Sequence, residues 1–106
     1  MSAGGPDLPL TVDLQEGFAG EEVTIRVGGD DVFRRSDVRT RMQTGRADGW
    51  SGPVRPGYVR LEVDVAERRV SGRLELRVER PMFVGVKYVP EDGFSFLVQD
   101  FPFRYM

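Results

Sequence analysis

The sequence predicts an all-β fold: a single antiparallel β-sandwich of seven or eight short strands, with a distorted barrel as the alternative. Apolar residues alternate with polar ones along four stretches, which is typical of strands with one buried and one solvated face. Glycine or proline interrupts nearly every window of ten residues, so no helical pattern lasts for more than a turn. The 106 residues suit one domain, which we place at residues 8–106 after a flexible N-terminal segment, residues 1–7.

The first half of the chain contains three predicted strands. Alternation predicts strands over residues 8–14 and 22–27. The sequence Gly-Gly-Asp-Asp at residues 28–31 predicts a tight turn. A third strand follows over residues 32–42, with a bulge or corner at Ser36-Asp37.

The second half contains a predicted hairpin. The alternation of its side chains, the length of its turn and its cross-strand charges all favour the same register. A turn at residues 66–69 pairs Val65 with Val70, and the apolar residues of both strands then share one face. On the solvated face this register pairs opposite charges, Glu62 with Arg73 and Arg60 with Glu75. Together with the earlier strands it predicts a core of Leu10, Val12, Val23, Ile25, Val59, Leu61, Val63, Leu74, Leu76 and Val78.

The last hairpin has two possible registers. A four-residue loop, residues 90–93, pairs Val89 with Phe94, whereas a five-residue loop unites the apolar residues of both strands on one face. The turn chemistry favours the first and the apolar pattern the second, which we prefer. The C-terminal segment, residues 101–106, is rich in aromatic residues. We expect it to be docked, either as a last strand on its own sheet or against a neighbouring copy.

The candidate binding residues come from the loops. Residues 43–57 show no alternation and are predicted to form one long loop around the only tryptophan, Trp50. If successive loops alternate between the two ends of a sandwich, this loop shares an end with Phe18 and Phe101, whose rings either cap the core or form an exposed patch. An exposed Trp50 beside Arg46 and Arg55 has the composition of an interface hot spot. The candidate binding residues are therefore Phe18, Arg46, Trp50, Arg55 and Phe101.

The composition excludes much of catalysis and metal chemistry. The chain has no cysteine and no histidine, so it has no disulfide, no thiolate zinc site and no Ser-His-Asp triad. Carboxylates alternate with arginines on the solvated strand faces, as on a charge-paired surface. Asp30, Asp31 and Asp92 could share one end of the sandwich and hold calcium, but aspartate is also a common turn residue beside glycine. We predict no catalytic residue, no metal site and no cofactor.

These observations favour a non-catalytic interaction module that binds a protein partner or its own copy, with a homo-oligomer as a possible form. The alternatives are a carbohydrate- or small-ligand-binding sandwich that uses its loop aromatics, and an accessory subunit of an enzyme. The size and the alternation resemble immunoglobulin- and fibronectin-type sandwiches in architecture, although this chain has no cysteines.

Charge and targeting signals limit the partners further. The formal net charge of −2 disfavours binding to nucleic acid, which depends on an excess of basic residues. The N-terminal residues show neither a basic region nor an apolar one, and no apolar stretch approaches the roughly 18 residues of a membrane span. We therefore expect a cytoplasmic protein with no nucleic-acid or membrane partner.

Overall fold

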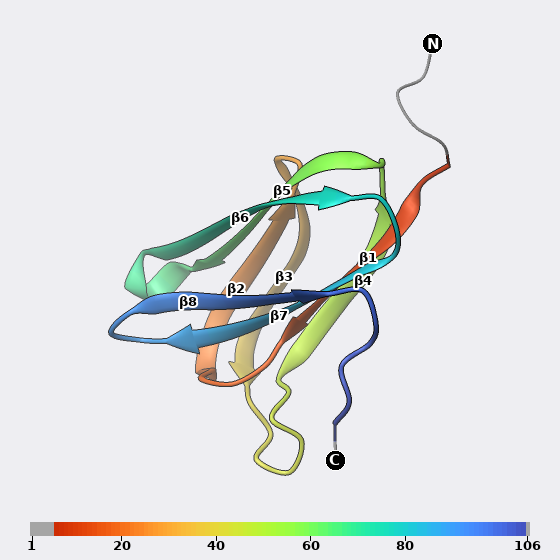
Figure 1. The fold of residues 1–106 in the computed structure, drawn as a ribbon. Helices are drawn as coiled ribbons and strands as arrows, with labels where there is room; N and C mark the ends of the chain where they lie inside the picture. Colours follow the sequence, from red (N-terminus) through yellow and green to blue (C-terminus); the bar gives the residue numbers. More distant parts are fainter. Residues whose placement is uncertain (1–5, 106) are drawn as a thin grey trace.

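The computed structural model describes residues 6–105, which form eight strands and one short 3-10 helix. The elements are β1 (Leu8–Leu14), β2 (Ala19–Val27), β3 (Asp30–Arg39), β4 (Asp48–Val54), β5 (Gly57–Val65), η1 (Ala66–Arg68), β6 (Val70–Val78), β7 (Met82–Val89) and β8 (Gly93–Gln99). Two four-stranded sheets face each other, so the predicted all-β sandwich is confirmed (Figure 1). Residues 1–5, most of the predicted N-terminal segment, lie outside the described residues.

The strand order is β4-β1-β7-β8 in the first sheet and β3-β2-β5-β6 in the second. Neighbouring strands are antiparallel, except that β1 and β7 run parallel with Leu14 opposite Val86. The chain crosses between the sheets after β1, β3, β4 and β6. Each sheet therefore has two edge strands: β4 and β8 in the first, β3 and β6 in the second.

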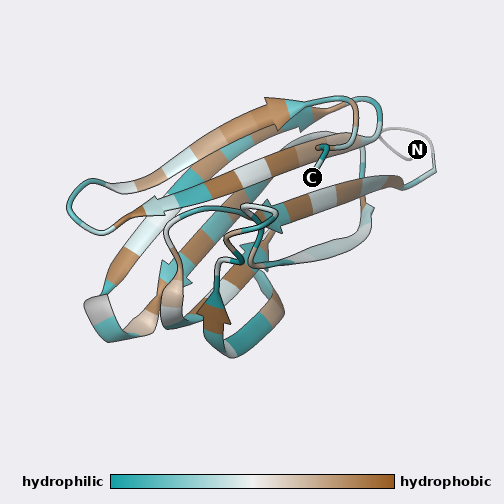
Figure 2. Cartoon of the chain, turned by 90° about the horizontal axis from the view of Figure 1, so that it is seen from below, coloured by the Kyte–Doolittle hydropathy of each residue, from teal (hydrophilic) through white to brown (hydrophobic). Residues whose placement is uncertain are grey.

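The core lies between the inner faces of the two sheets, where apolar residues of one parity pack together. Hydrophobic and hydrophilic residues alternate as brown and teal bands along the strands (Figure 2). Eight of the ten predicted core residues are buried, and the other two, Val59 and Leu74, are half-buried and pack against them. Further buried residues come from β1, β3, β4, β5, β7 and the β1–β2 loop: Leu14, Phe18, Val38, Val54, Val65, Val84, Val86 and Tyr88.

The β5–β6 hairpin has the predicted register throughout, from Val65 opposite Val70 to Val59 opposite Leu76. Its turn is η1 followed by Arg69, which adopts a left-handed backbone with φ 52°. On the outer face Arg73 Nε lies 4.0 Å from Glu62 Oε2. Gly72 has a packing role, because a Cβ there would lie 2.6 Å from the Phe94 ring of the opposite sheet. The glycine therefore lets β6 and β8 approach at one side of the sandwich.

In the β7–β8 hairpin the loop is shorter than the five residues we preferred, but the apolar residues of both strands share one face as predicted. Val89 pairs with Gly93, so three residues rather than five form the loop. Gly93 has φ +96°, a conformation that favours glycine, and it lets β8 start directly after the turn. Both loop lengths are odd, so both leave the same residues on the inner face, with Tyr88 opposite Phe94 and Val86 opposite Phe96.

The β2–β3 hairpin is tighter than predicted. Only Gly28 and Gly29 form its loop, both with positive φ (60° and 90°), and Asp30 already pairs with Val27. The predicted bulge is present, because the pairing shifts by one residue around Ser36-Asp37 and Asp37 has φ 57°. The strand ends at Arg39 and does not extend to Met42.

The predicted long loop of residues 43–57 is wrong. Residues 48–54 form β4, an edge strand that pairs with β1 along its whole length. The sequence hid this strand because Gly49, Gly52 and Pro53 break the alternation of side chains. An edge strand tolerates them, since one of its sides has no ladder of hydrogen bonds to satisfy. The loop that remains before β4 is residues 40–47.

The additional strand moves every later loop to the opposite end of the sandwich. The β1–β2, β3–β4, β5–β6 and β7–β8 connections share one end, where Tyr88 N donates to Glu16 O (2.9 Å) and Glu22 N to Glu67. The β2–β3, β4–β5 and β6–β7 connections lie at the other end. Asp92 therefore lies away from Asp30 and Asp31, so the suggested calcium ligands do not meet. Within residues 6–105 no three acidic side chains are grouped to hold a metal ion.

Candidate functional site

The five candidate binding residues do not form one patch. Phe18 is buried in the core, where its ring stacks on Tyr88 with centroids 5.8 Å apart. Trp50 lies opposite Val12 on the inner face of β4, is half-buried and packs against the core over Gly52. Phe18 is therefore buried and Trp50 is partly buried, whereas the sequence-based hypothesis required exposed rings.

The two arginines beside Trp50 in the sequence lie at opposite ends of the molecule, because β4 runs between them. Arg55 lines an open groove of about 360 Å³ together with Pro53, Pro56 and Tyr58. Arg46 lies at the other end, in the 40–47 loop. Phe101, the last of the five, lies just beyond β8 and is 60% exposed.

Arg46 belongs to a polar cluster on the outer face of the first sheet, which we call the notch: Asp13, Gln15, Arg46 and the ring of Tyr105. Asp13 and Gln15 alternate with the core residues of β1 and so point outward, yet each is only 7% exposed. Tyr105 Oη donates a hydrogen bond to Asp13 Oδ2 (2.7 Å), and Gln15 Nε2 donates to Tyr105 Oη (3.0 Å). The Arg46 guanidinium lies 3.7 Å from Asp13 Oδ1 and 5.9 Å from the centroid of the Tyr105 ring.

Glycines on both neighbouring strands form the floor of the notch. Gly49 of β4 and Gly85 of β7 are the two register partners of Asp13. A Cβ at Gly49 would lie 2.5 Å from Arg46 Nη2 and 2.9 Å from Asp13 Oδ1. A Cβ at Gly85 would lie 2.7 Å from both Nε2 and Oε1 of Gln15. The side chains of Asp13 and Gln15 lie flat on the sheet in the space that the glycines leave. There Asp13 accepts a hydrogen bond from the Tyr105 hydroxyl and Gln15 donates one to it.

The environment of the notch keeps the Tyr105 hydroxyl protonated. Burial is the main cause, and it raises the pKa of Tyr105 to about 12. The hydrogen bond from Gln15 and the charge of Arg46 act in the opposite direction, while the Asp13 carboxylate adds to the increase. At neutral pH the phenol is therefore a hydrogen-bond donor to a carboxylate, an interaction stronger than one between neutral groups.

A second candidate surface is the edge of β8. Among the four edge strands, all within the described residues, β3 and β6 carry several charged side chains, and β3 also carries the bulge. β4 carries a proline and two glycines. β8 is Gly-Phe-Ser-Phe-Leu-Val-Gln, without charge, proline or bulge. Leu97 and Val98 of β8 are 55% and 37% exposed. β8 thus lacks the devices that usually prevent an edge from pairing with another chain.

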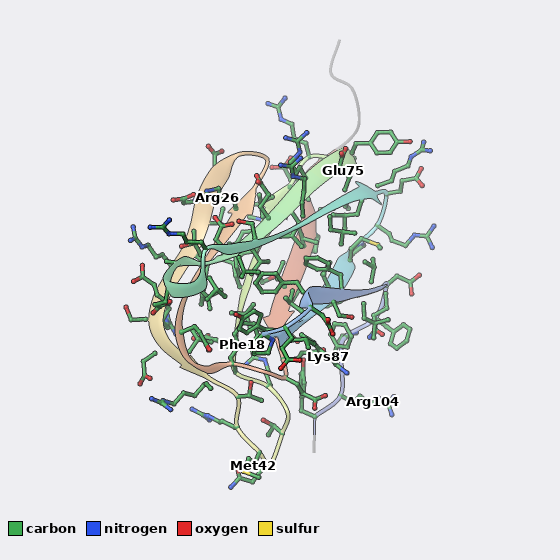
Figure 3. All side chains as sticks on the ribbon, turned by 90° about the vertical axis from the view of Figure 1, so that its left-hand side faces the viewer. Phe18, Arg26, Met42, Glu75, Lys87 and Arg104 are labelled. Carbon is green, nitrogen blue, oxygen red and sulfur yellow. The ribbon has the colours of Figure 1, made fainter. Side chains whose placement is uncertain are left out.

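The outer face of the second sheet has a different character. Arg26 forms ion pairs with Asp31 and Asp64, and Arg34 Nε lies 2.8 Å from Glu22 Oε2. The hydrogen bond to Asp64 is the main cause of the raised pKa of Arg26. Figure 3 shows Arg26 and Glu75 on this side of the molecule. Mutually paired, partly exposed charges of this kind are typical of a charge-paired outer sheet face.

Comparisons with known proteins do not assign this chain to a family. No known protein family matches it, and no curated protein matches it by sequence. No helix among residues 6–105 is long and apolar enough to cross a membrane.

Sequence reasoning missed the two surfaces for different reasons. The neutral run of residues 93–99 was visible, but its place at a sheet edge depends on the strand order. Asp13 and Tyr105 are 92 residues apart, and nothing local to either residue indicates their contact. Gly85 within the apolar strand β7 was the available signal, because glycine inside a strand often marks a close approach.

Proposed function

We propose that this protein is a non-catalytic interaction module that associates with a second copy by pairing their β8 strands edge to edge. The uncharged β8 edge is the observation that carries the proposal. The exposed side chains of Leu97 and Val98 support it, since pairing would cover them in each copy. Such pairing would join the first sheet of one copy to the first sheet of the other, which gives one continuous sheet of eight strands.

The charges next to β8 favour one arrangement of the two copies. A parallel pair would bring the acidic tips, Glu91 and Asp92, together. An antiparallel pair centred on Phe96 would place Asp92 opposite Asp100, again with like charges. An antiparallel pair centred on Leu97 avoids both, because Ser95 then faces Gln99 and Phe96 faces Val98. Like charges opposite each other destabilise strand pairing, so we propose the register centred on Leu97.

The solution mass tests the association. Sedimentation equilibrium of the full chain should give a dimer of twice the 12.0 kDa chain mass. Leu97→Lys should raise the dimer dissociation constant at least tenfold, because it places two like charges against each other at the centre of the pair. Met42→Lys is the matched control, since Met42 is 97% exposed at the tip of the 40–47 loop (Figure 3). A monomeric wild type, or a Leu97→Lys dimer as stable as the Met42→Lys dimer, would contradict the proposal.

Cysteine cross-linking tests the register. The chain has no cysteine, so Leu97→Cys introduces a single thiol that faces its own copy across the symmetry axis. A short bifunctional maleimide should link this variant into a covalent dimer. Ser95→Cys alone should not be linked, because its copies would be about 13 Å apart, four residues along the strand. Mixing Ser95→Cys with Gln99→Cys should restore linking. Linking of Ser95→Cys alone would refute the register.

A further inference from the structure

The notch holds buried polar side chains on the outer face of a sheet. On the outer face of a sheet, side chains are normally solvated, yet an Asp and a Gln here are each about nine-tenths buried. Glycines on both neighbouring strands leave the space that these side chains use. Buried polar groups need partners, and the phenol of Tyr105 bonds to both.

Beyond the Arg80–Asp100 ion pair (3.3 Å) and the hydrogen bond from Gln99 Nε2 to Phe101 O (2.7 Å), the C-terminal segment is held by Tyr105 in the notch. Residues 100–105 form no strand, so no ladder of backbone hydrogen bonds ties them to the sheet. Phe101 is exposed, Phe103 is only half-buried, and Arg104 projects away from the body (Figure 3). Five residues, 100–104, connect Gln99 to Tyr105, a span short enough to hold the ring close to the notch. The segment therefore resembles a tethered ligand more than a strand of the sandwich.

We infer that the notch is a binding site for an unmodified tyrosine side chain carried by an extended peptide, and that the protein's own C-terminal segment occupies it as a tethered, displaceable ligand. The chemistry of the ligand follows from the contacts of Tyr105. Asp13 accepts a hydrogen bond from the phenol hydroxyl, Gln15 donates one to the phenol oxygen, and the Arg46 guanidinium lies over the ring. The partner we infer is a peptide similar to the C-terminal segment: an extended chain that is rich in aromatic residues and carries a tyrosine.

The same contacts define what the notch rejects. Phenylalanine lacks the hydroxyl and would leave the Asp13 carboxylate without its donor, which costs affinity at a buried site. Phosphotyrosine has no phenolic proton and would bring a charge of about −1.5 to −2 to the position that Asp13 Oδ2 faces. The notch therefore selects the neutral phenol.

Tyr105 is covalently linked to β8 through residues 100–104, and this link determines how well a separate peptide can compete for the notch. A ligand on a short flexible linker reaches an effective concentration on the order of millimolar, so a free peptide competes poorly with the intact segment. Tyr105→Ala in the full chain should vacate the notch and leave all eight strands unchanged. The probe is a synthetic amidated peptide of residues 100–105. Its binding is followed by NMR at the amides of Gly49 and Gly85 and by Trp50 fluorescence.

We expect this peptide to bind the Tyr105→Ala chain at least tenfold more tightly than it binds the wild type. Peptides with Tyr105→Phe, or with phosphotyrosine at this position, should bind at least tenfold more weakly. Asp13→Asn in the Tyr105→Ala chain should reduce binding of the tyrosine peptide and remove its preference over the phenylalanine peptide. If Tyr105→Ala does not fold, Tyr105→Phe replaces it, because it keeps the ring and removes the hydroxyl.

Three results would overturn the inference: no binding to the vacated notch, equal binding of the tyrosine and phenylalanine peptides, or binding that is indifferent to Asp13→Asn. The inference does not depend on dimer formation at β8. The peptide titration can be repeated on Leu97→Lys, so failure of one proposal leaves the other testable.

Discussion

Leu61 and Leu74 allow the energetics of the core to be tested with two identical substitutions. They face each other across the β5–β6 pair and point to the same inner face. Leu61 is fully buried, whereas Leu74 is half-buried on the edge strand β6. Truncation to alanine removes the same atoms at both positions, so the difference between the two costs reports burial and the cavity left behind.

The expected costs differ by a factor of about two or three. Leu61→Ala should lower the free energy of unfolding by about 3–5 kcal/mol, the upper range for buried leucine, because closely packed neighbours cannot fill the space. Leu74→Ala should cost about 1–2 kcal/mol, since solvent already reaches part of that side chain. For a domain whose total stability is about 5–15 kcal/mol, the first change is severe. It should lower the Tm by at least about 12 °C.

Urea denaturation followed by circular dichroism measures both costs. The urea concentration at the unfolding midpoint should fall strongly for Leu61→Ala and weakly for Leu74→Ala. The slope of the free energy of unfolding against urea concentration should stay unchanged. Equal costs would show that Leu74 is as buried as Leu61 and that β6 packs more deeply than described. A cost below about 1 kcal/mol for Leu61→Ala would refute its place in the core.

Two further predictions concern particular contacts. Gly72→Ala should cost about 1–3 kcal/mol, because the new Cβ would lie 2.6 Å from the Phe94 ring, and adding Phe94→Leu should recover part of that cost in the same urea assay. The stability of the wild type should fall between about pH 10 and pH 12, since the folded pKa of Tyr105, about 12, exceeds the ordinary value of 10.0 and the unfolded chain releases that proton first. Tyr105→Phe should make the free energy of unfolding less dependent on pH across this range, and an unchanged pH dependence would contradict the burial of the Tyr105 hydroxyl in the notch.

The strands with regular alternation were predictable from the sequence. In the β5–β6 hairpin, side-chain parity, turn length and cross-strand charge all depend on residues within 20 positions, and they agree on one register. In the β7–β8 hairpin the parity was predictable but the loop length was not. Three- and five-residue loops satisfy the same alternation, and the conformation of Gly93 decides between them.

β4 shows where sequence reasoning failed and what followed from it. Its glycines and proline are typical of a loop, and only pairing with β1 makes these residues a strand. Because each strand reverses the chain, one missed strand placed every later loop at the wrong end. Trp50 was therefore expected in a loop beside Phe18, whereas it lies within β4 and faces the core.

The sequence by itself determined the all-β class, most of the core and the absence of thiol and imidazole chemistry. These properties depend on composition and on a two-residue period, both of which are local. Only the tertiary structure decided which strands are edges and which distant side chains meet. The exposure of β8 depends on the strand order, and the notch joins Asp13 to Tyr105 across 92 positions. Such contacts follow from how the sheets stack and where the chain crosses between them, which no local pattern records.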